Sequence, residues 1–333
     1  MCLLLTSGAL LHAQPASPSP TPAKTLTAEQ LTELAESDRL AAKVVELHKQ
    51  GKYDEAMPLA ERQVAIREKI LGPNDGGTAA AWINLAELYF AKKNYTEAEK
   101  LYQRILSAYE AAFGANHLNN SMIVERLALI EYLRGSFTEA ETFYARALMI
   151  QERAHPEDHS DVAQAALNLG EYYRSRRAYS KAGPLFLRAI AINDKVLPRD
   201  DPAVGQAVQR YRCFLYESEG VVNAEKKLSE LAKSRGPSQP PASGGGVLNG
   251  KALSLPTPAY PSEARSIHAS GIVMVEITID EKGKVIEARS ICGHPVFAKP
   301  SVEAAYRARF TPTKLSGAPV QVHGIIIYNF MTP

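Results

Sequence analysis

The chain has 333 residues, enough for two domains, and its 45% hydrophobic and 22% charged residues are typical of a soluble protein. Its formal net charge is +2 and it has no dense run of Lys and Arg, which excludes the strongly basic class of nucleic-acid-binding proteins. No apolar stretch approaches the roughly 20 residues that a membrane-spanning helix needs.

The first residues have the features of a secretory signal. The apolar run Met1–Leu11 leads to a small residue, Ala13, directly before Gln14, although no positively charged segment precedes the run. This pattern predicts export and removal of a signal peptide, residues 1–13. A Pro/Ser-rich tether, residues 14–27, is expected to follow. The alternative is an ordinary disordered end.

A repeat of 42 residues runs through the next part of the chain. Two columns keep this spacing, one aromatic and one of alanines: Tyr53, Tyr95, Phe137 and Tyr179, and Ala56, Ala98, Ala140 and Ala182. A fixed period over four copies predicts a stacked solenoid, because no single unit can bury its apolar face alone. We expect helical repeats over residues 28–233, opened by a capping box of Thr27 and Gln30.

Each copy contains the same local pattern, best seen in Ala80–Ala98. It reads N-L-A/G-x-x-Y, then a turn, then Y/F-x-x-A, and it resembles the tetratricopeptide repeat. The longer period, with G-P-N-D or H-P-E-D-H between units, resembles the kinesin-light-chain subtype of that family. The resemblance covers residues 38–232. It implies an all-α solenoid that binds proteins or peptides.

The same resemblance implies a ligand-binding surface. Peptide-binding repeats of this family present an Asn just before the core Leu, the position of Asn84 and Asn168 here; Arg126 and Arg210 stand in the same column. Stacking would align these amide and guanidinium donors, which suit an acidic peptide or a C-terminal carboxylate. The alternative is a solvated face that binds nothing.

A flexible connection is expected after the repeats. Residues 234–247 are rich in Gly, Pro and Ser, which predicts a linker that lets the two halves of the chain move independently. Cys213 and Cys292 lie on opposite sides of it, and Cys2 would leave with the signal peptide. Because the cysteines fall in different predicted domains, no disulfide is expected.

Beyond the linker the hydrophobic period changes from helical to two. Alternating residues predict strands, and a D-E-K-G hairpin turn joins the first two of them. The predicted elements are strands at 271–279 and 284–291, a helix at 301–309 and a strand at 320–330. This ββαβ order over residues 248–333 predicts a small α+β domain.

Several short motifs in this region occur together: Leu255-Pro256, Tyr260–Ala264, Asp280–Val285, Gly317–Val320 and Tyr328-x-Phe330. Together they resemble the TonB C-terminal domain. The resemblance implies a periplasmic domain that docks a short peptide of outer-membrane receptors as an added strand. The namesake of that family also has a membrane helix coupled to a proton-driven motor. The sequence shows no such helix, so energy transduction does not carry over.

The final strand is the expected docking edge. The resemblance implies that it lies at the edge of the sheet, where unpaired N–H and C=O groups are a template for another strand. The residues expected along this edge are Val320, Val322, Ile325, Ile327 and Tyr328. The alternatives are an edge that pairs with a second copy, giving a homodimer, and an edge covered by the chain's own linker.

No catalytic pattern is found in the sequence. His155 and His159 have the spacing of a metal pair, but Pro156 argues against one helix presenting both rings, and the segment corresponds to the loops between earlier repeats. The other histidines considered lack ligand-spaced partners: His268, His294 and His323. No nucleophile elbow or phosphate loop occurs. The sequence predicts a non-catalytic protein without metal or cofactor.

Two functions of different classes remain. The first is a periplasmic adaptor, in which the repeats hold one protein or peptide and the C-terminal domain docks an envelope partner. The second is a component of TonB-dependent energised outer-membrane transport whose membrane anchor comes from a partner. Only the second predicts an association with motor subunits.

Overall fold

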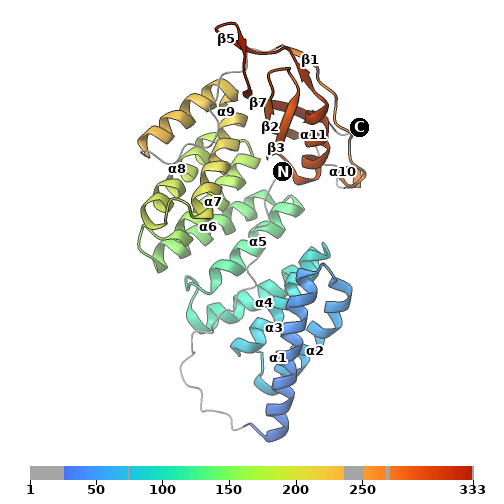
Figure 1. Cartoon of the computed structure of the whole chain (residues 1–333). Helices are drawn as coiled ribbons and strands as arrows, with labels where there is room; N and C mark the ends of the chain where they lie inside the picture. Colours follow the sequence, from blue (N-terminus) through green and yellow to red (C-terminus); the bar gives the residue numbers. More distant parts are fainter. Residues whose placement is uncertain (1–25, 74, 236–250, 267–270, 332–333) are drawn as a thin grey trace. The chain divides into compact units, whose positions relative to one another are not determined.

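The computed structural model describes residues 26–73, 75–235, 251–266 and 271–331 (Figure 1). They form two compact units, an N-terminal unit up to Tyr172 and a C-terminal unit from Tyr173 onward. The expected signal peptide and most of the expected tether and linker lie outside the described residues. None of the helices in the described ranges combines the length and the apolarity that crossing a membrane requires.

The N-terminal unit is built from helices that pack as pairs, and the last helix that begins in this unit ends just inside the C-terminal unit. They are α1 (Ala28–Lys49), α2 (Tyr53–Leu71), α3 (Gly76–Ala91), α4 (Tyr95–Phe113), α5 (Asn120–Arg134), α6 (Phe137–Ala154) and α7 (Ser160–Ser175). The predicted capping box opens α1: the Thr27 hydroxyl accepts the Gln30 N–H at 3.2 Å, and the Gln30 side chain accepts the Thr27 N–H at 2.9 Å. This confirms the predicted capping box.

A left-handed residue turns the chain within each helix pair of this unit. Gly51, Lys93 and Gly135, each one period apart, have φ of 72°, 61° and 88°. The next residue closes the turn by donating its N–H to a carbonyl five residues back, as Asn94 does to Tyr89 at 2.8 Å. Glycine adopts this conformation without steric cost, whereas Lys93 bears about 1 kcal/mol of strain.

The alanine column explains how closely the paired helices approach. Ala56, Ala98 and Ala140 are completely buried, and so are Ala182 and Ala224 in the C-terminal unit. A larger side chain at any of these positions would force the helices apart. Large side chains fill the remaining space, among them Trp82, whose indole N–H donates to Glu68 at 2.8 Å. The all-α solenoid predicted from the period is therefore confirmed.

The C-terminal unit begins with two further helices, α8 (Tyr179–Val196) and α9 (Pro202–Ser234). Gly220, with φ 76° and ψ 167°, kinks α9 near the place where the turn of a further repeat is expected. The Tyr216 hydroxyl donates to Glu225 across this kink. The kinked helix thus corresponds to a last helix pair.

A three-stranded antiparallel sheet follows, built from β2 (Gly271–Ile279), β3 (Val285–Cys292) and β7 (Val322–Phe330) in the order β3-β2-β7. Helix α11 (Pro295–Arg307) covers one face of it (Figure 1). The shorter elements are β1 (Ala252–Ser254), α10 (Ser262–Ser266), β4 (Arg309–Phe310), β5 (Lys314–Leu315) and β6 (Ala318–Pro319); β1 pairs with β4, and β5 with β6. The predicted α+β class is confirmed.

Several element boundaries differ from the prediction: β3 lies one residue later at both ends, and the helix ends at Arg307 rather than at residue 309. The helix was expected to start after Pro300, since an interior Pro normally breaks a helix. Instead it starts at Pro295, capped by His294, whose Nδ1 accepts the Val296 N–H at 3.2 Å. The last strand begins two residues later than expected, because the Val320 N–H donates to Thr313 at 2.9 Å, outside the main sheet.

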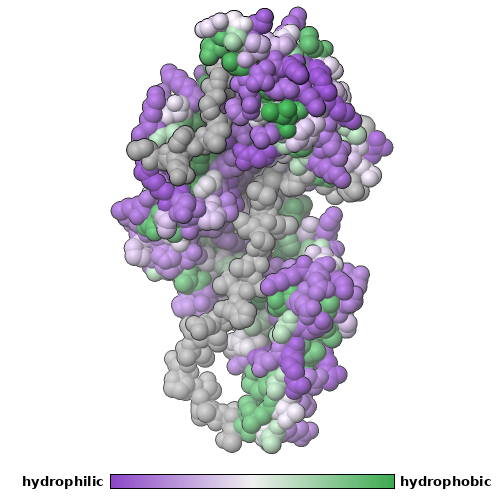
Figure 2. Space-filling model, in the orientation of Figure 1, coloured by the Kyte–Doolittle hydropathy of each residue, from purple (hydrophilic) through white to green (hydrophobic). Residues whose placement is uncertain are grey.

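Apolar residues of the sheet pack under α11. Val273, Val275 and Ile277 on β2 are at most 2% exposed, and the buried Phe297 ring stacks on Phe330 with centroids 4.0 Å apart. On the opposite face of β2, Met274 is also buried, although the alternation predicted a solvated face there. Hydrophilic residues cover most of the described surface on the face drawn in Figure 2.

Candidate functional site

Three of the four predicted ligand-contacting residues lie in the N-terminal unit. Asn84 lies on α3, Arg126 on α5 and Asn168 on α7, and all three are half-buried. The repeat places them at one position of the first helix of successive repeats. Their side chains are already engaged within the protein, as the Asn84 amide is by the Gln63 side-chain oxygen at 3.3 Å.

Arg126 forms an ion pair with Glu87 of the preceding repeat. Its Nε lies 2.7 Å from Glu87 Oε1, and the two side chains are only 20% and 13% exposed. The Tyr102 hydroxyl donates to the same oxygen at 2.7 Å, and burial raises the pKa of Tyr102 well above its ordinary value. The guanidinium predicted to receive a ligand carboxylate therefore already holds a carboxylate of the protein itself.

Asn168 links two repeats through Glu125 on α5. The Gln164 amide donates to Asn168 Oδ1 at 2.8 Å, and the Asn168 amide in turn donates to the Glu125 carboxylate. Burial raises the pKa of Glu125 from its ordinary 4.5 to about 7, although Asn168 and the nearby Arg126 act to lower it. Arg126 and Asn168 thus take part in polar contacts that join the first helices of successive repeats.

The raised pKa of Glu125 makes the stability of this unit depend on pH. A folded-state pKa above the unfolded value means that the folded state binds more protons, so stability falls as pH rises from about 4.5 to 7 and is level above. At 1.36 kcal/mol for each pKa unit, the rise from 4.5 to about 7 sets an upper limit of about 3.4 kcal/mol on this contribution, and partial exposure of the side chain reduces it.

We therefore expect Glu125→Gln to match the wild type in stability near pH 4.5 and to exceed it by about 1–3 kcal/mol at pH 8. Urea unfolding followed by the fluorescence of Trp82, the only tryptophan of the chain, measures this difference. A difference that does not change between these two pH values would contradict the raised pKa.

The fourth predicted residue, Arg210, lies on α9 in the C-terminal unit. Its side chain is only 8% exposed. It is therefore buried rather than displayed on a surface.

The predicted strand edge is built by β7. In the order β3-β2-β7, no described strand pairs with the outer side of β7. Val322 and Tyr328 point into the core, at 3% and 5% exposure, whereas Ile327 is 45% exposed and Ile325 half-buried on the other face. Val320, also expected along this edge, lies just before the strand.

The opposite edge of the sheet, along β3, is closed at both ends. At its start, the Gly283 carbonyl accepts the Phe310 N–H at 2.9 Å, and Lys284 bridges to Arg309 of β4. At its end, the Ile291 carbonyl accepts a hydrogen bond from Gln209 of α9 at 2.6 Å. Within the described residues, β7 is therefore the more accessible edge for an added strand.

The sheet also carries a polar chain that crosses all three strands. Thr278 on β2 lies 3.0 Å from a carboxylate oxygen of Glu287 on β3 and 3.0 Å from Nδ1 of His323 on β7. The single hydroxyl proton goes to the carboxylate, so His323 Nδ1 carries a proton and donates to Thr278. His323 therefore has a structural partner that sequence spacing did not reveal.

His155 and His159 lie in the loop between α6 and α7, so no single helix presents both rings, as expected, and the loop brings the two rings together. Their rings stack with centroids 3.8 Å apart and planes 5° apart, and Asp161 Oδ2 lies 3.6 Å from a nitrogen of each. Their ligand atoms all lie within 4.8 Å of one another. The lone pairs of stacked parallel rings lie in parallel planes, however, and cannot converge on one ion without a ring rotation.

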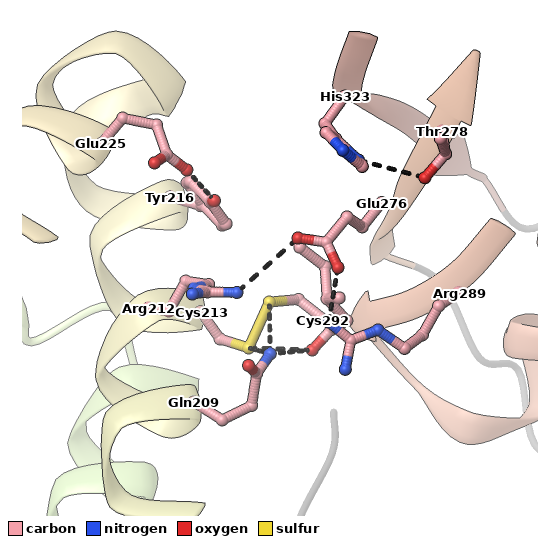
Figure 3. A network of polar contacts seen from close by, with 11 residues as sticks. Gln209, Arg212, Cys213, Tyr216, Glu225, Glu276, Thr278, Arg289, Cys292 and His323 are labelled. Carbon is pink, nitrogen blue, oxygen red and sulfur yellow. Dashed lines mark hydrogen bonds and ion pairs between the residues drawn. A yellow bond between two sulfur atoms is a disulfide. The ribbon is translucent and has the colours of Figure 1, made fainter. Parts of the chain in front are cut away.

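The expectation that the cysteines do not pair is wrong. Cys213 on α9 and Cys292 at the end of β3 form a disulfide, with Cα atoms 5.5 Å apart (Figure 3). The expectation rested on placing the two residues in different predicted domains, between which a bond is not expected. One signal in the sequence could have revealed it: removal of residues 1–13 leaves two cysteines, and an exported protein can pair them.

Comparisons with known proteins identify two kinds of module. The tetratricopeptide repeat model matches residues 44–111, 77–124 and 120–195. The model described as the Gram-negative bacterial TonB protein C-terminal matches residues 256–332. Neither model is that of an enzyme.

Solved structures resemble the repeats. One, described as Podosopora anserina kinesin light chain nearly identical TPR-like repeats, is 20% identical over 61% of this chain and 95% of its own, with a TM-score of 0.52. BtubC from P. vanneervenii is 20% identical over 68% of this chain and 100% of its own, with a TM-score of 0.50. At this identity the likeness shows the fold alone. No curated protein matches the sequence.

Proposed function

Because the chain contains tetratricopeptide repeats and a TonB C-terminal domain, we propose that it is a non-catalytic periplasmic adaptor. The repeats bind one protein or peptide, and the C-terminal domain docks an envelope partner as a strand added to β7. The observation that carries this proposal is the asymmetry of the sheet: β3 is closed at both ends, and no described strand pairs with the outer side of β7.

Main-chain hydrogen bonds to β7 supply the affinity, and the outward residues supply selectivity. Ile325 and Ile327 face outward next to that edge and offer apolar contacts to alternate side chains of the incoming strand. The periplasmic assignment is supported by the Gram-negative TonB family match and by the Cys213–Cys292 disulfide, since disulfides persist in oxidising compartments.

The chain offers a matched pair of positions for testing this proposal. Ile327 on β7 is 45% exposed and Ile286 on β3 is 43% exposed. Both tolerate Lys in the isolated protein, but strand addition at β7 would desolvate a charge only at position 327. We expect Ile327→Lys to lower recovery of the partner from envelope extract at least about tenfold, and Ile286→Lys to leave it unchanged.

Photo-crosslinkers at the same two positions identify what binds. An envelope protein joined through position 327 and not 286 supports the adaptor. A second copy of this chain at position 327 means that the edge makes a homodimer, and motor subunits in the complex favour the transport component. Equal recovery by the two Lys variants would contradict strand addition at β7.

A further inference from the structure

The C-terminal unit contains a junction between the last repeat helix and the sheet (Figure 3). Cys213 of α9 is bonded to Cys292, and Gln209 one turn earlier donates to the Ile291 carbonyl at 2.6 Å. Beside them, Arg212 lies 3.9 Å from Glu276 of β2. Helix α9 therefore holds the end of β3 by a covalent bond and by a hydrogen bond to its backbone, and it contacts β2 through the Arg212–Glu276 ion pair.

A second charged residue completes the junction. Glu276 also pairs with Arg289, which stands opposite it on β3. One carboxylate thus faces a guanidinium from the helix and another from the neighbouring strand. Met274, on the same face of β2 and in register with Cys292, is only 2% exposed. The buried Met274 agrees with α9 covering this part of the face.

The positions of Gln209 and Cys213 within the repeat are informative. Gln209 follows Glu125 by two periods of 42 residues, and Cys213 follows Glu87 by three. In the N-terminal unit these two columns reach from one repeat to the next: Glu87 contacts Arg126, and Glu125 contacts Asn168. On α9, the same columns contact the end of β3.

We propose that the C-terminal domain docks on the last repeat through Gln209 and Cys213, the two repeat positions that in earlier repeats contact the following repeat. The disulfide locks the domain there. The occupant of this surface is a segment of the same chain, Ile291–Cys292. The domain therefore terminates the solenoid, as a capping repeat would, and keeps other ligands away from this face of α9. The predicted independent movement of the two halves is replaced by a fixed junction.

Closing the junction is an oxidation. The thiols of Cys213 and Cys292 lose two protons and two electrons to a disulfide-bearing oxidant, such as a thiol–disulfide oxidoreductase, which is reduced to a dithiol. The lock thus forms in an oxidising compartment. Reduction leaves the Gln209 hydrogen bond, the Arg212–Glu276 contact and the surrounding packing.

The covalent part is tested on the full chain carrying a specific protease site between Gly244 and Gly245 in the linker. The protein is taken from an oxidising compartment, treated with an alkylating agent and cleaved. We expect the two pieces to remain one band on a non-reducing denaturing gel and to separate after reduction, and the Cys213→Ser variant to separate at once. Alkylated Cys213 and Cys292 in the starting protein would refute the lock.

The docking is tested without the disulfide. A Cys213→Ser, Cys292→Ser variant is folded as a full chain, cleaved in the linker and analysed by native gel filtration over a dilution series. We expect the pieces to co-elute, and Gln209→Ala to raise their Kd about two- to tenfold, as loss of one hydrogen bond does. Gln206→Ala, an exposed position one turn away, is the control and should have no effect.

The two results are separable from the adaptor function, because neither measures a partner at β7. Circular dichroism of each variant before cleavage establishes that it is folded. Pieces that separate at every concentration, or a Kd changed equally by Gln206→Ala and Gln209→Ala, would overturn the proposed docking surface.

Discussion

The Gly283→Ala variant is expected to lose the folded C-terminal domain. Gly283 has φ +84°, and an added Cβ would lie 1.9 Å from the Phe310 carbonyl oxygen. That neighbour is backbone held by the hydrogen bond from Phe310 N–H to Gly283, so it cannot swing aside. Overpacking and the left-handed conformation together cost about 2–5 kcal/mol, comparable with the whole stability of a small domain.

Gly317→Ala is the matched control. Gly317 has φ +88° in the turn between β5 and β6 of the same domain, but an added Cβ would have no atom within 4 Å. It therefore bears only the conformational cost, about 1–2 kcal/mol. Hydrogen exchange of peptides from β2 and β7 measures both effects. Equal protection in the two variants would show that the close approach to Phe310 does not decide the stability.

The turn at Gly283 also shows what local sequence predicts well. The Asp280 carboxylate accepts the N–H groups of Lys282 and Lys284 at 3.0 and 2.8 Å, so the predicted D-E-K-G hairpin forms from side chains and backbone only a few residues apart. The close packing of the paired helices at the alanine column was predicted equally well, because one spacing imposes the same packing on every repeat. Local chemistry and fixed periods therefore predicted the elements and the fold class.

Contacts between residues distant in sequence were not predicted. The disulfide joins cysteines 79 residues apart, and no pattern in either segment specifies the other. The same limit applies to the candidate site. The 42-residue period puts Arg126 at the same repeat position as Asn84 and Asn168, but what each side chain contacts depends on the neighbouring helices. The Arg126 guanidinium, which was expected to bind a ligand, forms an ion pair with the Glu87 carboxylate of the preceding repeat.

This occupancy changes what a substitution at position 126 measures. We expect Arg126→Ala to destabilise the N-terminal unit by about 3–5 kcal/mol, because it leaves the Glu87 carboxylate, only 13% exposed, without its cation. Arg62→Ala is the control: Arg62 lies 2.8 Å from Glu36, at nearly the same distance, but those side chains are 63% and 40% exposed. An exposed pair of this kind contributes at most about 1 kcal/mol.

Urea unfolding followed by Trp82 fluorescence compares the two variants directly, since Trp82 lies on α3 with Glu87. Adding Glu87→Gln to Arg126→Ala should restore part of the lost stability, because an amide has no charge to bury and its oxygen still accepts the Tyr102 hydroxyl. No recovery in the double variant would mean that Arg126 acts through packing rather than charge. Arg126→Ala weakens the fold itself, so a loss of ligand binding in that variant would not identify Arg126 as a ligand contact. Arg126→Lys keeps the charge, so a loss of ligand binding in that variant would identify Arg126 as a ligand contact.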